Sequence, residues 1–507
     1  MTGAWRRVLA TLIAIAPFLV LAAAEWPLQP DLWYSDFAQY VAHAGALADG
    51  RPYTDTGYLF TPRAFAWAPP AYPPGLPLAL SPVVWAFDGS IAAVKAWMIV
   101  LSVATLVVIG AYFWRRVGPF AGLAVMGLVG LSPQWVSLSV APLSDVVFAG
   151  VVWATLSAAD ERRTWGRGRV AAVTVLLATA VAFRPHGLTL LPALAVWGLI
   201  HRREVGSRVF LPVAAVVAGL LLTWLMLPVG SMRGIHPLRM VVELLTGPPR
   251  YHLAVFESHL YPFPWDLAND GYHLATSGLM LLGLWFFARR HGLTLSLVFG
   301  AVYGLALASM VPTDPRYAFP LYPLFVFGLV NGACHVPRRW VPDRAGPLTL
   351  GFAALLAIVS VVRGVTRATE PRALDDPDYR ALVAWVQEYR ASDRTPLRVA
   401  VFRPRVLAWE TDASAMPLLT WRATELHLEE WCVRDITHVI VGAVGEGMGG
   451  RVRWTSAALE SRPDAFEVVY ENGAFTVHRL RRDVLCPPSR EAEVGSPATR
   501  SSDSTRP

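Results

Sequence analysis

Charged residues are scarce in this sequence: they make up 16% of its 507 residues, whereas 54% are hydrophobic. This balance excludes an ordinary soluble protein, because a soluble domain has no use for so much apolar surface. Lysine is nearly absent, with Lys95 as the only one, so arginine carries almost all of the positive charge. We interpret the net charge of +7 as a compositional bias toward arginine and expect no nucleic-acid partner.

Cysteine is rare as well. The three cysteines are Cys334, Cys432 and Cys486, and no CxxC pair or Cys/His cluster accompanies them, which argues against a structural zinc site. Two of them lie in the C-terminal part of the chain. If that part is extracytoplasmic, Cys432 and Cys486 could form a disulfide, and the alternative is two unpaired thiols. The sequence leaves both open.

Long apolar runs, by contrast, recur throughout the first 363 residues. The longer runs can cross roughly 30 Å of hydrocarbon, several shorter ones would have to extend or tilt, and helices satisfy their own backbone hydrogen bonds there. The sequence therefore predicts a polytopic α-helical membrane protein with about 11 transmembrane helices in residues 1–363. The expected spans are 8–24, 91–113, 120–139, 146–159, 170–183, 188–200, 209–229, 273–288, 293–311, 317–334 and 347–362.

Arginines are distributed unevenly between these spans. Every second connection is short and arginine-rich, which is the positive-inside pattern of cytoplasmic loops. The pattern predicts a cytoplasmic N-terminus and an extracytoplasmic C-terminal region. Residues 1–24 also fit a cleavable signal peptide, but we favour an uncleaved first span. The arginines concerned are Arg6, Arg7, Arg115, Arg116, Arg162, Arg163, Arg167, Arg169, Arg202, Arg203, Arg208, Arg289, Arg290, Arg338, Arg339 and Arg344.

The remaining connections and the C-terminal region differ in composition. Residues 25–90 and 230–272 form long outer loops rich in proline and aromatic residues. Residues 372–485 read as a small α/β domain, with the amphipathic helix "DPDYRALVAWVQEYR" and the strands "LRVAVF", "THVIVGAV", "FEVVYE" and "AFTVHRL". Residues 487–507 lack any apolar period and are expected to be a disordered tail.

Asp36 lies shortly after the first span, in "SDFAQYVAH". Asp36, Tyr40 and His43 follow one another at helical spacing, i, i+4 and i+7, so they share one face of the expected helix. An acid near the bilayer edge is costly unless it has a partner or a task. The alternative interpretation is a helix cap or a solvated loop acid. We treat Asp36 as a candidate catalytic residue, with Tyr40 and His43 as supporting residues.

Three further charged residues occupy predicted outer span ends. Asp145 in "APLSD" begins the fourth span, where ordinary N-capping is the competing interpretation. Arg184 in "FRPHG" and Arg316 in "DPRYAFP" run against the inward arginine bias, so an anionic partner is expected for each. Snorkelling toward lipid phosphate is the alternative for both arginines. His186 and Tyr317 lie beside them as candidate supporting residues.

The combined pattern indicates a particular chemistry. Two carboxylates and two arginines at one membrane face could receive a lipid phosphate from the bilayer, since the planar guanidinium fork suits phosphate. A carboxylate could act as general base on an incoming hydroxyl. Phosphate leaves readily once its charge is neutralised, so no second acid is needed to protonate it. The pattern predicts attack by an alcohol on a sugar carried by a lipid phosphate.

Five stretches, in order, also carry a resemblance: "SDFAQYVAHAGALADGRPYTD", "PAYPPGLPLALSP", "APLSD", "FRPHGLTLLPAL" and "DPRYAFPLYP". With them the chain resembles bacterial membrane glycosyltransferases of the GT-C superfamily, in the branch of the protein O-mannosyltransferases and the lipid A aminoarabinose transferases. The segments "AWVQEYRASDRTPLRVAVFRPRVLAWETD" and "FEVVYENGAFTVHRL" resemble the small extracytoplasmic domain of many such proteins. The resemblance covers about residues 30–485.

The resemblance implies an inverting glycosyltransferase of the bacterial cell (inner) membrane. Members move a sugar from a polyprenyl-phosphate donor to a cell-envelope acceptor on the outer face, and the acceptor is a lipid, a polysaccharide or a protein. By this resemblance Asp36 and Asp145 are the catalytic acids, and Arg184 and Arg316 contact the donor phosphate. Metal dependence varies in the superfamily, so the cofactor is unknown: a divalent metal is compatible with the sequence but not required, and no metal ligands are assigned.

Two departures from the family and two alternatives accompany this expectation. The second outer loop has a single acid, Asp145. Many relatives carry an Asp-Glu pair in the first loop, whereas Phe37 follows Asp36 here, so protein mannosylation is not specifically expected. A transporter or flippase for lipid-linked sugars is the main alternative, although transporters usually place polar residues near the bilayer midplane. The second alternative is a non-catalytic GT-C relative.

Overall fold

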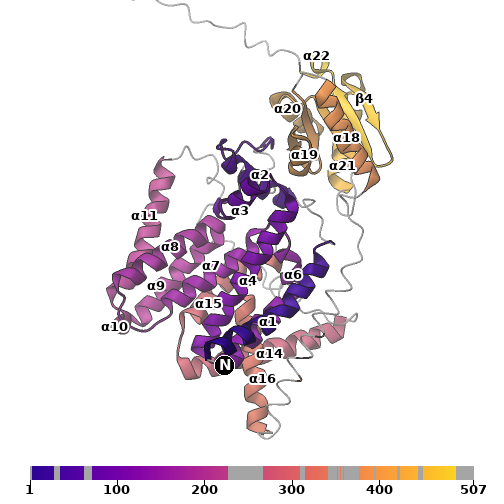
Figure 1. Cartoon of the computed structure of the whole chain (residues 1–507). Helices are drawn as coiled ribbons and strands as arrows, with labels where there is room; N and C mark the ends of the chain where they lie inside the picture. Colours follow the sequence, from indigo (N-terminus) through magenta and orange to yellow (C-terminus); the bar gives the residue numbers. More distant parts are fainter. Residues whose placement is uncertain are drawn as a thin grey trace, which may run out of the picture. The chain divides into compact units, whose positions relative to one another are not determined.

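The computed structural model divides the chain into two compact units. The helical unit contains residues 1–56 and 71–372, and the C-terminal unit contains residues 57–70 and 373–507 (Figure 1). Most of the expected loop 230–272, most of the expected span 347–362 and the tail 487–507 lie outside the described residues. The structure describes residues 3–27, 35–61, 71–226, 266–308, 315–340, 376–392, 396–419, 423–442 and 449–486, with the single positions 351, 354 and 358.

Two of the described helices are long and apolar enough to cross a membrane, α1 (Gly3–Glu25) and α4 (Ile91–Arg116). They coincide with the expected spans 8–24 and 91–113. The Ser90 side chain caps the start of α4, and Arg115 and Arg116 occupy its last turn, where positive charge suits the helix dipole. Local sequence signals therefore fix both ends of this helix.

The expected continuous span 120–139 is wrong in its middle. The chain forms α5 (Pro119–Gly130) and α6 (Pro133–Ser139), which are bent by 70° with respect to each other. Pro133 lacks a backbone N–H and holds the preceding Ser132 in an extended conformation, so the helix stops there and starts again. The pair is one broken span or a re-entrant segment.

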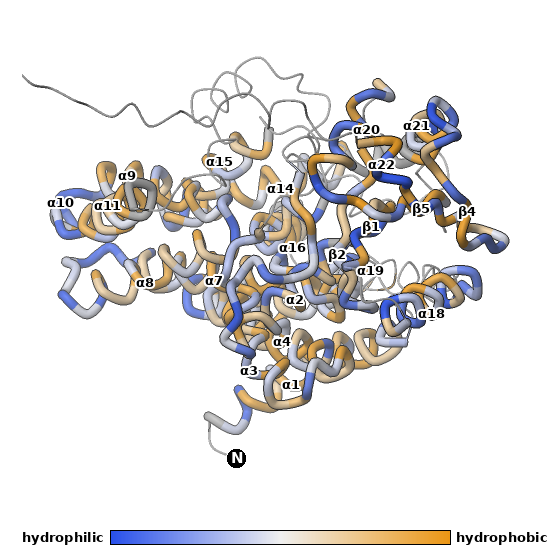
Figure 2. The backbone as a smooth tube through the Cα atoms, turned by 90° about the horizontal axis from the view of Figure 1, so that it is seen from above, coloured by the Kyte–Doolittle hydropathy of each residue, from blue (hydrophilic) through white to orange (hydrophobic). Residues whose placement is uncertain are grey.

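The other described apolar helices fall on the remaining expected spans, apart from α3, which lies inside the expected outer loop 25–90. Several are shorter than the roughly 20 residues of a straight span, so helix length does not establish eleven spans. Figure 2 shows hydrophobic residues along α8 and α9 and the hydrophilic turn at α10 (Arg202–Val205). These helices are α3 (Gly75–Ala86), α7 (Ser144–Ala159), α8 (Arg167–Phe183), α9 (Leu190–Ile200), α11 (Leu211–Met226), α14 (Asp266–His291), α15 (Leu295–Ala308) and α16 (Tyr322–Trp340).

Helix α7 lies at the core of the helical unit. It packs against α4 and α8, and most of its residues are buried. A Cβ atom added at Gly150 would collide with the Thr105 side chain of α4, so a larger residue here would force α4 or Thr105 to shift. Asp145 lies in the first turn of α7, and Asp160 directly follows the last residue of the helix. One buried acid therefore lies at each end of α7.

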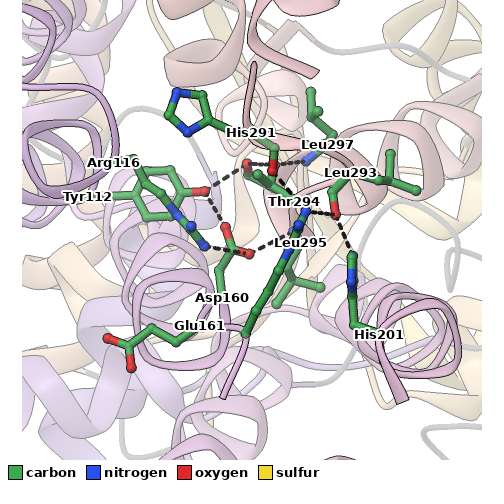
Figure 3. Close-up of polar contacts among 12 residues, drawn as sticks. Tyr112, Arg116, Asp160, Glu161, His201, His291, Leu293, Thr294, Leu295 and Leu297 are labelled. Carbon is green, nitrogen blue, oxygen red and sulfur yellow. Dashed lines mark hydrogen bonds and ion pairs between the residues drawn. The ribbon is translucent and has the colours of Figure 1, made fainter. Parts of the chain in front are cut away.

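Asp160 joins three helices at its end of α7 (Figure 3). Its carboxylate accepts hydrogen bonds from the Tyr112 hydroxyl at 2.7 Å and the Leu295 backbone N–H at 3.0 Å, and it lies 2.8 Å from Arg116 Nη2. The Tyr112 hydroxyl also lies 2.8 Å from Ser296 Oγ. We call these five residues the Asp160 cluster. It fastens the ends of α4 and α7 to the start of α15.

The C-terminal unit contains a five-stranded sheet with the order β2-β1-β3-β5-β4. The pairs β1–β2 and β1–β3 are parallel, and β3–β5 and β4–β5 are antiparallel. Four strands coincide with the four expected ones. The sequence did not indicate β2, because "SAMP" is short and ends in proline. The strands are β1 (Arg398–Val401), β2 (Ser414–Pro417), β3 (His438–Gly442), β4 (Phe466–Glu471) and β5 (Phe475–Leu480), and the main helices are α18 (Pro377–Ser392), α19 (Pro404–Thr411), α20 (Thr424–Val433) and α21 (Gly449–Glu460).

Two features close this unit. Cys432 and Cys486 form a disulfide across 54 residues of sequence, which contributes about 2–4 kcal/mol by restricting the unfolded chain. Residues 57–59 of the first loop also pair with the edge strand β2: the Leu59 N–H donates to the Ala415 carbonyl at 2.8 Å, and the Ala415 N–H donates to the Gly57 carbonyl at 2.8 Å. Residues 57–59 are therefore part of this unit's fold.

Candidate active site

Asp36 lies in the first turn of α2 (Ser35–Ala48) and contacts two side chains from distant parts of the chain. The Tyr72 hydroxyl donates a hydrogen bond to Asp36 Oδ1 at 2.6 Å. Arg316 Nη2, from the short helix η4 (Pro315–Ala318), lies 3.3 Å from Asp36 Oδ2. The Asp36 side chain keeps 27% of its surface exposed. It is therefore a partnered acid that solvent still reaches, rather than a simple helix cap.

Asp145 pairs with Arg184. Arg184 Nη1 lies 2.5 Å from Asp145 Oδ1, and the two side chains are 11% and 0% exposed. The N-cap position of α7 is Leu143, and Asp145 lies inside the first turn of the helix. The backbone at Arg184 is extended because Pro185 follows it, and this ends α8 at Phe183. Arg184 therefore has the anionic partner that was expected for an arginine at an outer span end.

Tyr317 connects the two ion pairs. The Arg184 and Arg316 guanidinium carbons lie 5.2 Å and 5.5 Å from the centre of its ring. The His186 ring stacks on the same tyrosine at 5.3 Å, with 22° between the planes. The four charged residues expected from the sequence therefore belong to one connected group. We call Asp36, Asp145, Arg184 and Arg316 the four-charge cluster.

The two supporting residues on α2 have different roles. The Tyr40 hydroxyl lies 3.1 Å from Ser144 Oγ, and the Tyr40 ring stacks on Tyr72 at 4.9 Å. Burial raises the pKa of Tyr40 to about 12, so its hydroxyl stays protonated near neutral pH. His43 is fully buried and binds the backbone of Tyr53 and Tyr72. It supports the first loop, whereas Tyr40 borders the four-charge cluster.

Sequence reasoning missed Tyr72. This residue lies in the quoted motif "PAYPPGLPLALSP", but nothing in the motif distinguishes it from the other 14 tyrosines of the chain. A separation of 36 residues between Tyr72 and Asp36 gives no helical or strand spacing that would pair them. Its position directly before two prolines, which fixes an extended backbone, is the one available signal.

The arrangement suits an anion. Each guanidinium has five N–H donors, so an arginine that already contacts one carboxylate keeps donors for a phosphate. Among the residues that the structure describes, no group of three or more His, Cys, Asp or Glu side chains could hold a metal. The group can therefore neutralise a phosphate with two arginines while Asp36 accepts a proton beside them.

Comparisons with solved structures bear on the fold. ArnT from Cupriavidus metallidurans, bound to undecaprenyl phosphate, aligns over 94% of this chain and 98% of its own, with 14% identity and a TM-score of 0.62. The chain has the GT-C fold. The archaeal oligosaccharyltransferase AglB from Archaeoglobus fulgidus, in complex with an inhibitory peptide and a dolichol-phosphate, aligns over 93% of this chain and 75% of its own, with 11% identity and a TM-score of 0.52.

No protein-family model and no curated protein sequence matches the chain. The family resemblance of the five sequence stretches is therefore supported by structure at the level of the fold. ArnT and AglB are glycosyltransferases, and the two structures hold undecaprenyl phosphate and a dolichol-phosphate, respectively. At 14% and 11% identity these neighbours assign no residue of the four-charge cluster.

Proposed function

We propose that this protein is an inverting glycosyltransferase that moves a sugar from a polyprenyl-phosphate donor to a cell-envelope acceptor. The observation that carries the proposal is the position of Asp36, whose two carboxylate oxygens face Tyr72 and Arg316, with Arg184 across the Tyr317 ring. A general base thus lies beside two phosphate-binding groups. The fold shared with two lipid-phosphate-binding glycosyltransferases supports the same class of reaction.

The proposed reaction is a single displacement at the anomeric carbon. Arg184 and Arg316 bind the donor phosphate and neutralise the charge that develops on it. The acceptor hydroxyl forms a new bond to the anomeric carbon as the bond from that carbon to the phosphate oxygen breaks, and the electron pair stays on the phosphate. Asp36 takes the proton of the acceptor hydroxyl. Asp145, which is fully buried, holds Arg184 in place as the second acid of the site.

The proposed location is the outer face of a bacterial inner membrane, with a cytoplasmic N-terminus and an extracytoplasmic C-terminal unit. The Cys432–Cys486 disulfide supports this orientation, because such bonds persist in oxidising compartments. Arg115 and Arg116 end α4, and Arg116 belongs to the Asp160 cluster. Arg162 and Arg163 follow Asp160 closely in sequence. These four arginines lie toward the end of α7 opposite the four-charge cluster, which supports the proposed orientation by the positive-inside rule.

The test is Asp36→Asn in the purified full-length protein. Labelled undecaprenyl-phosphate-linked hexoses and pentoses serve as donors, and the released undecaprenyl phosphate is measured. We expect a loss of about 10²–10⁴-fold in turnover, because a general base contributes that much, with undecaprenyl phosphate binding unchanged. Asp36→Asn with normal turnover would remove Asp36 from the chemistry. Donor translocation across vesicles that persists in this variant without any sugar transfer would favour the flippase instead.

A further inference from the structure

Tyr72 makes a short contact with the proposed base. Its hydroxyl donates to Asp36 Oδ1 at 2.6 Å, within the range of hydrogen bonds to ionised carboxylates. The Tyr72 ring stacks on Tyr40 at 4.9 Å with 30° between the planes, and Tyr40 is itself buried. The hydroxyl is therefore held by a ring that cannot easily turn away from Asp36.

The backbone of Tyr72 is held in turn by a closed set of three hydrogen bonds. The Tyr72 N–H donates to His43 Nε2 at 3.3 Å, so this nitrogen is the acceptor and Nδ1 carries the proton. His43 Nδ1 then donates to the Tyr53 carbonyl at 2.6 Å. The Tyr53 hydroxyl donates to the Tyr72 carbonyl at 2.8 Å. We call His43, Tyr53 and Tyr72 the loop neck.

The loop neck holds together the two ends of the segment between Tyr53 and Tyr72. Residues 57–70, between Tyr53 and Tyr72 in sequence, belong to the C-terminal unit, whereas both tyrosines belong to the helical unit. His43 comes from α2, the same helix that carries Asp36. The loop neck therefore fixes the position of Tyr72 with respect to α2, the helix that carries the proposed base.

We infer that Tyr72 is a positioning residue for the transfer reaction: it orients Asp36 and stabilises its ionised form, and the loop neck holds Tyr72 in register. The inference rests on the proposed function, because it assigns Tyr72 a role through Asp36. A carboxylate that loses a hydrogen-bond donor keeps its proton to a higher pH. Loss of the Tyr72 hydroxyl therefore moves the pH range in which Asp36 can act as base.

The primary test is Tyr72→Phe, which keeps the ring and its stacking on Tyr40. We expect turnover near neutral pH to fall about 10–100-fold, since hydrogen bonds to charged groups are among the stronger ones. The acidic limb of the pH–rate profile should move up by about one pH unit. The KM for the lipid-linked donor should stay within about twofold, because the Tyr72 hydroxyl bonds to the proposed base, Asp36.

Tyr112→Phe is the matched control. Tyr112 donates to a buried aspartate, Asp160, at 2.7 Å, so the substitution removes the same kind of bond at the other end of α7. It should lower the melting temperature without moving the pH–rate profile. An equal pH shift in Tyr112→Phe would show that general destabilisation causes the effect and would overturn the inference.

Tyr53→Phe tests the loop neck. If Tyr53 acts through Tyr72, the double variant Tyr53→Phe/Tyr72→Phe loses no more turnover than Tyr72→Phe alone. Fully additive losses contradict the proposed chain of contacts. The outcome of Asp36→Asn separates the two proposals. If that variant is inactive and Tyr72→Phe keeps a normal rate and pH profile, the positioning role fails and the proposed function stands. If Asp36→Asn is fully active, the proposed function fails.

Discussion

The two ends of α7 hold similar residues in different settings. Asp145 and Asp160 lie about 22 Å apart along the helix, and each pairs with an arginine in a group that includes a tyrosine–aspartate hydrogen bond. Around Asp160, one carboxylate receives a hydroxyl, a backbone N–H and a guanidinium, and its side chain is 2% exposed. In the four-charge cluster, Asp36 and Arg316 keep 27% and 21% of their side-chain surface exposed.

We interpret this difference as that between a structural cluster and the proposed active site. Charged groups that bind a substrate must stay accessible to it. A purely structural cluster is more stable when every carboxylate oxygen is buried and hydrogen-bonded. Residue type alone does not distinguish the two groups, because both contain Asp, Arg and Tyr. The exposure of Asp36 and Arg316 does, since 27% and 21% of their side-chain surface stays exposed, whereas the Asp160 side chain is 2% exposed.

The largest expected effect is that of Arg184→Ala. It leaves the fully buried Asp145 carboxylate without its guanidinium partner, which typically costs about 3–5 kcal/mol of stability. The melting temperature in detergent should fall strongly, and sugar transfer should be lost. Adding Asp145→Asn should restore part of the melting temperature, since no charge then remains buried. Arg203→Ala, at an exposed arginine of α10, is the control and should keep the melting temperature of the wild type. If Arg184→Ala melts at the same temperature as this control, the ion pair does not stabilise the protein.

Asp160→Asn should have an intermediate effect. The amide keeps the shape of the side chain but removes the charge that faces Arg116, at a cost of about 1–3 kcal/mol. We expect a lower melting temperature and normal turnover for each folded molecule. A loss of turnover in molecules that remain folded would contradict a purely structural role, because the Asp160 cluster would then take part in the reaction.

Arg316→Lys should have the smallest effect on stability, below about 1 kcal/mol, because this ion pair is partly exposed. Lysine keeps the charge but loses the planar fork, so undecaprenyl phosphate should bind about tenfold more weakly. Arg289→Lys, at an exposed arginine of α14, provides the control for charge-conserving substitution. Unchanged binding in Arg316→Lys would argue that this arginine does not contact the phosphate.

The members of the four-charge cluster could be found from the sequence because charged residues are so scarce at outer span ends. Asp36, Asp145, Arg184 and Arg316 are exceptions in an apolar sequence, and exceptions can be named one by one. Their pairing could not be predicted, since the acid–arginine contacts join residues 39 and 280 positions apart. Spacing rules reach only about one helical turn or one strand neighbour.

The features that were missed have physical reasons. Tyr72 is one tyrosine among 15, and only the folded first loop brings its hydroxyl to Asp36. The bend between α5 and α6 depends on Pro133, which a hydrophobicity pattern does not weigh. Strand β2 has four residues and no alternation, and its position comes from pairing with β1 and with residues 57–59. Tertiary contacts decide in each case.

The most direct test of the central claim is a structure of this protein determined with undecaprenyl phosphate bound. We expect the phosphate group within hydrogen-bond distance of the guanidinium groups of Arg184 and Arg316, with Asp36 beside it. A phosphate bound at the Asp160 end of α7, or one that contacts neither arginine, would contradict it.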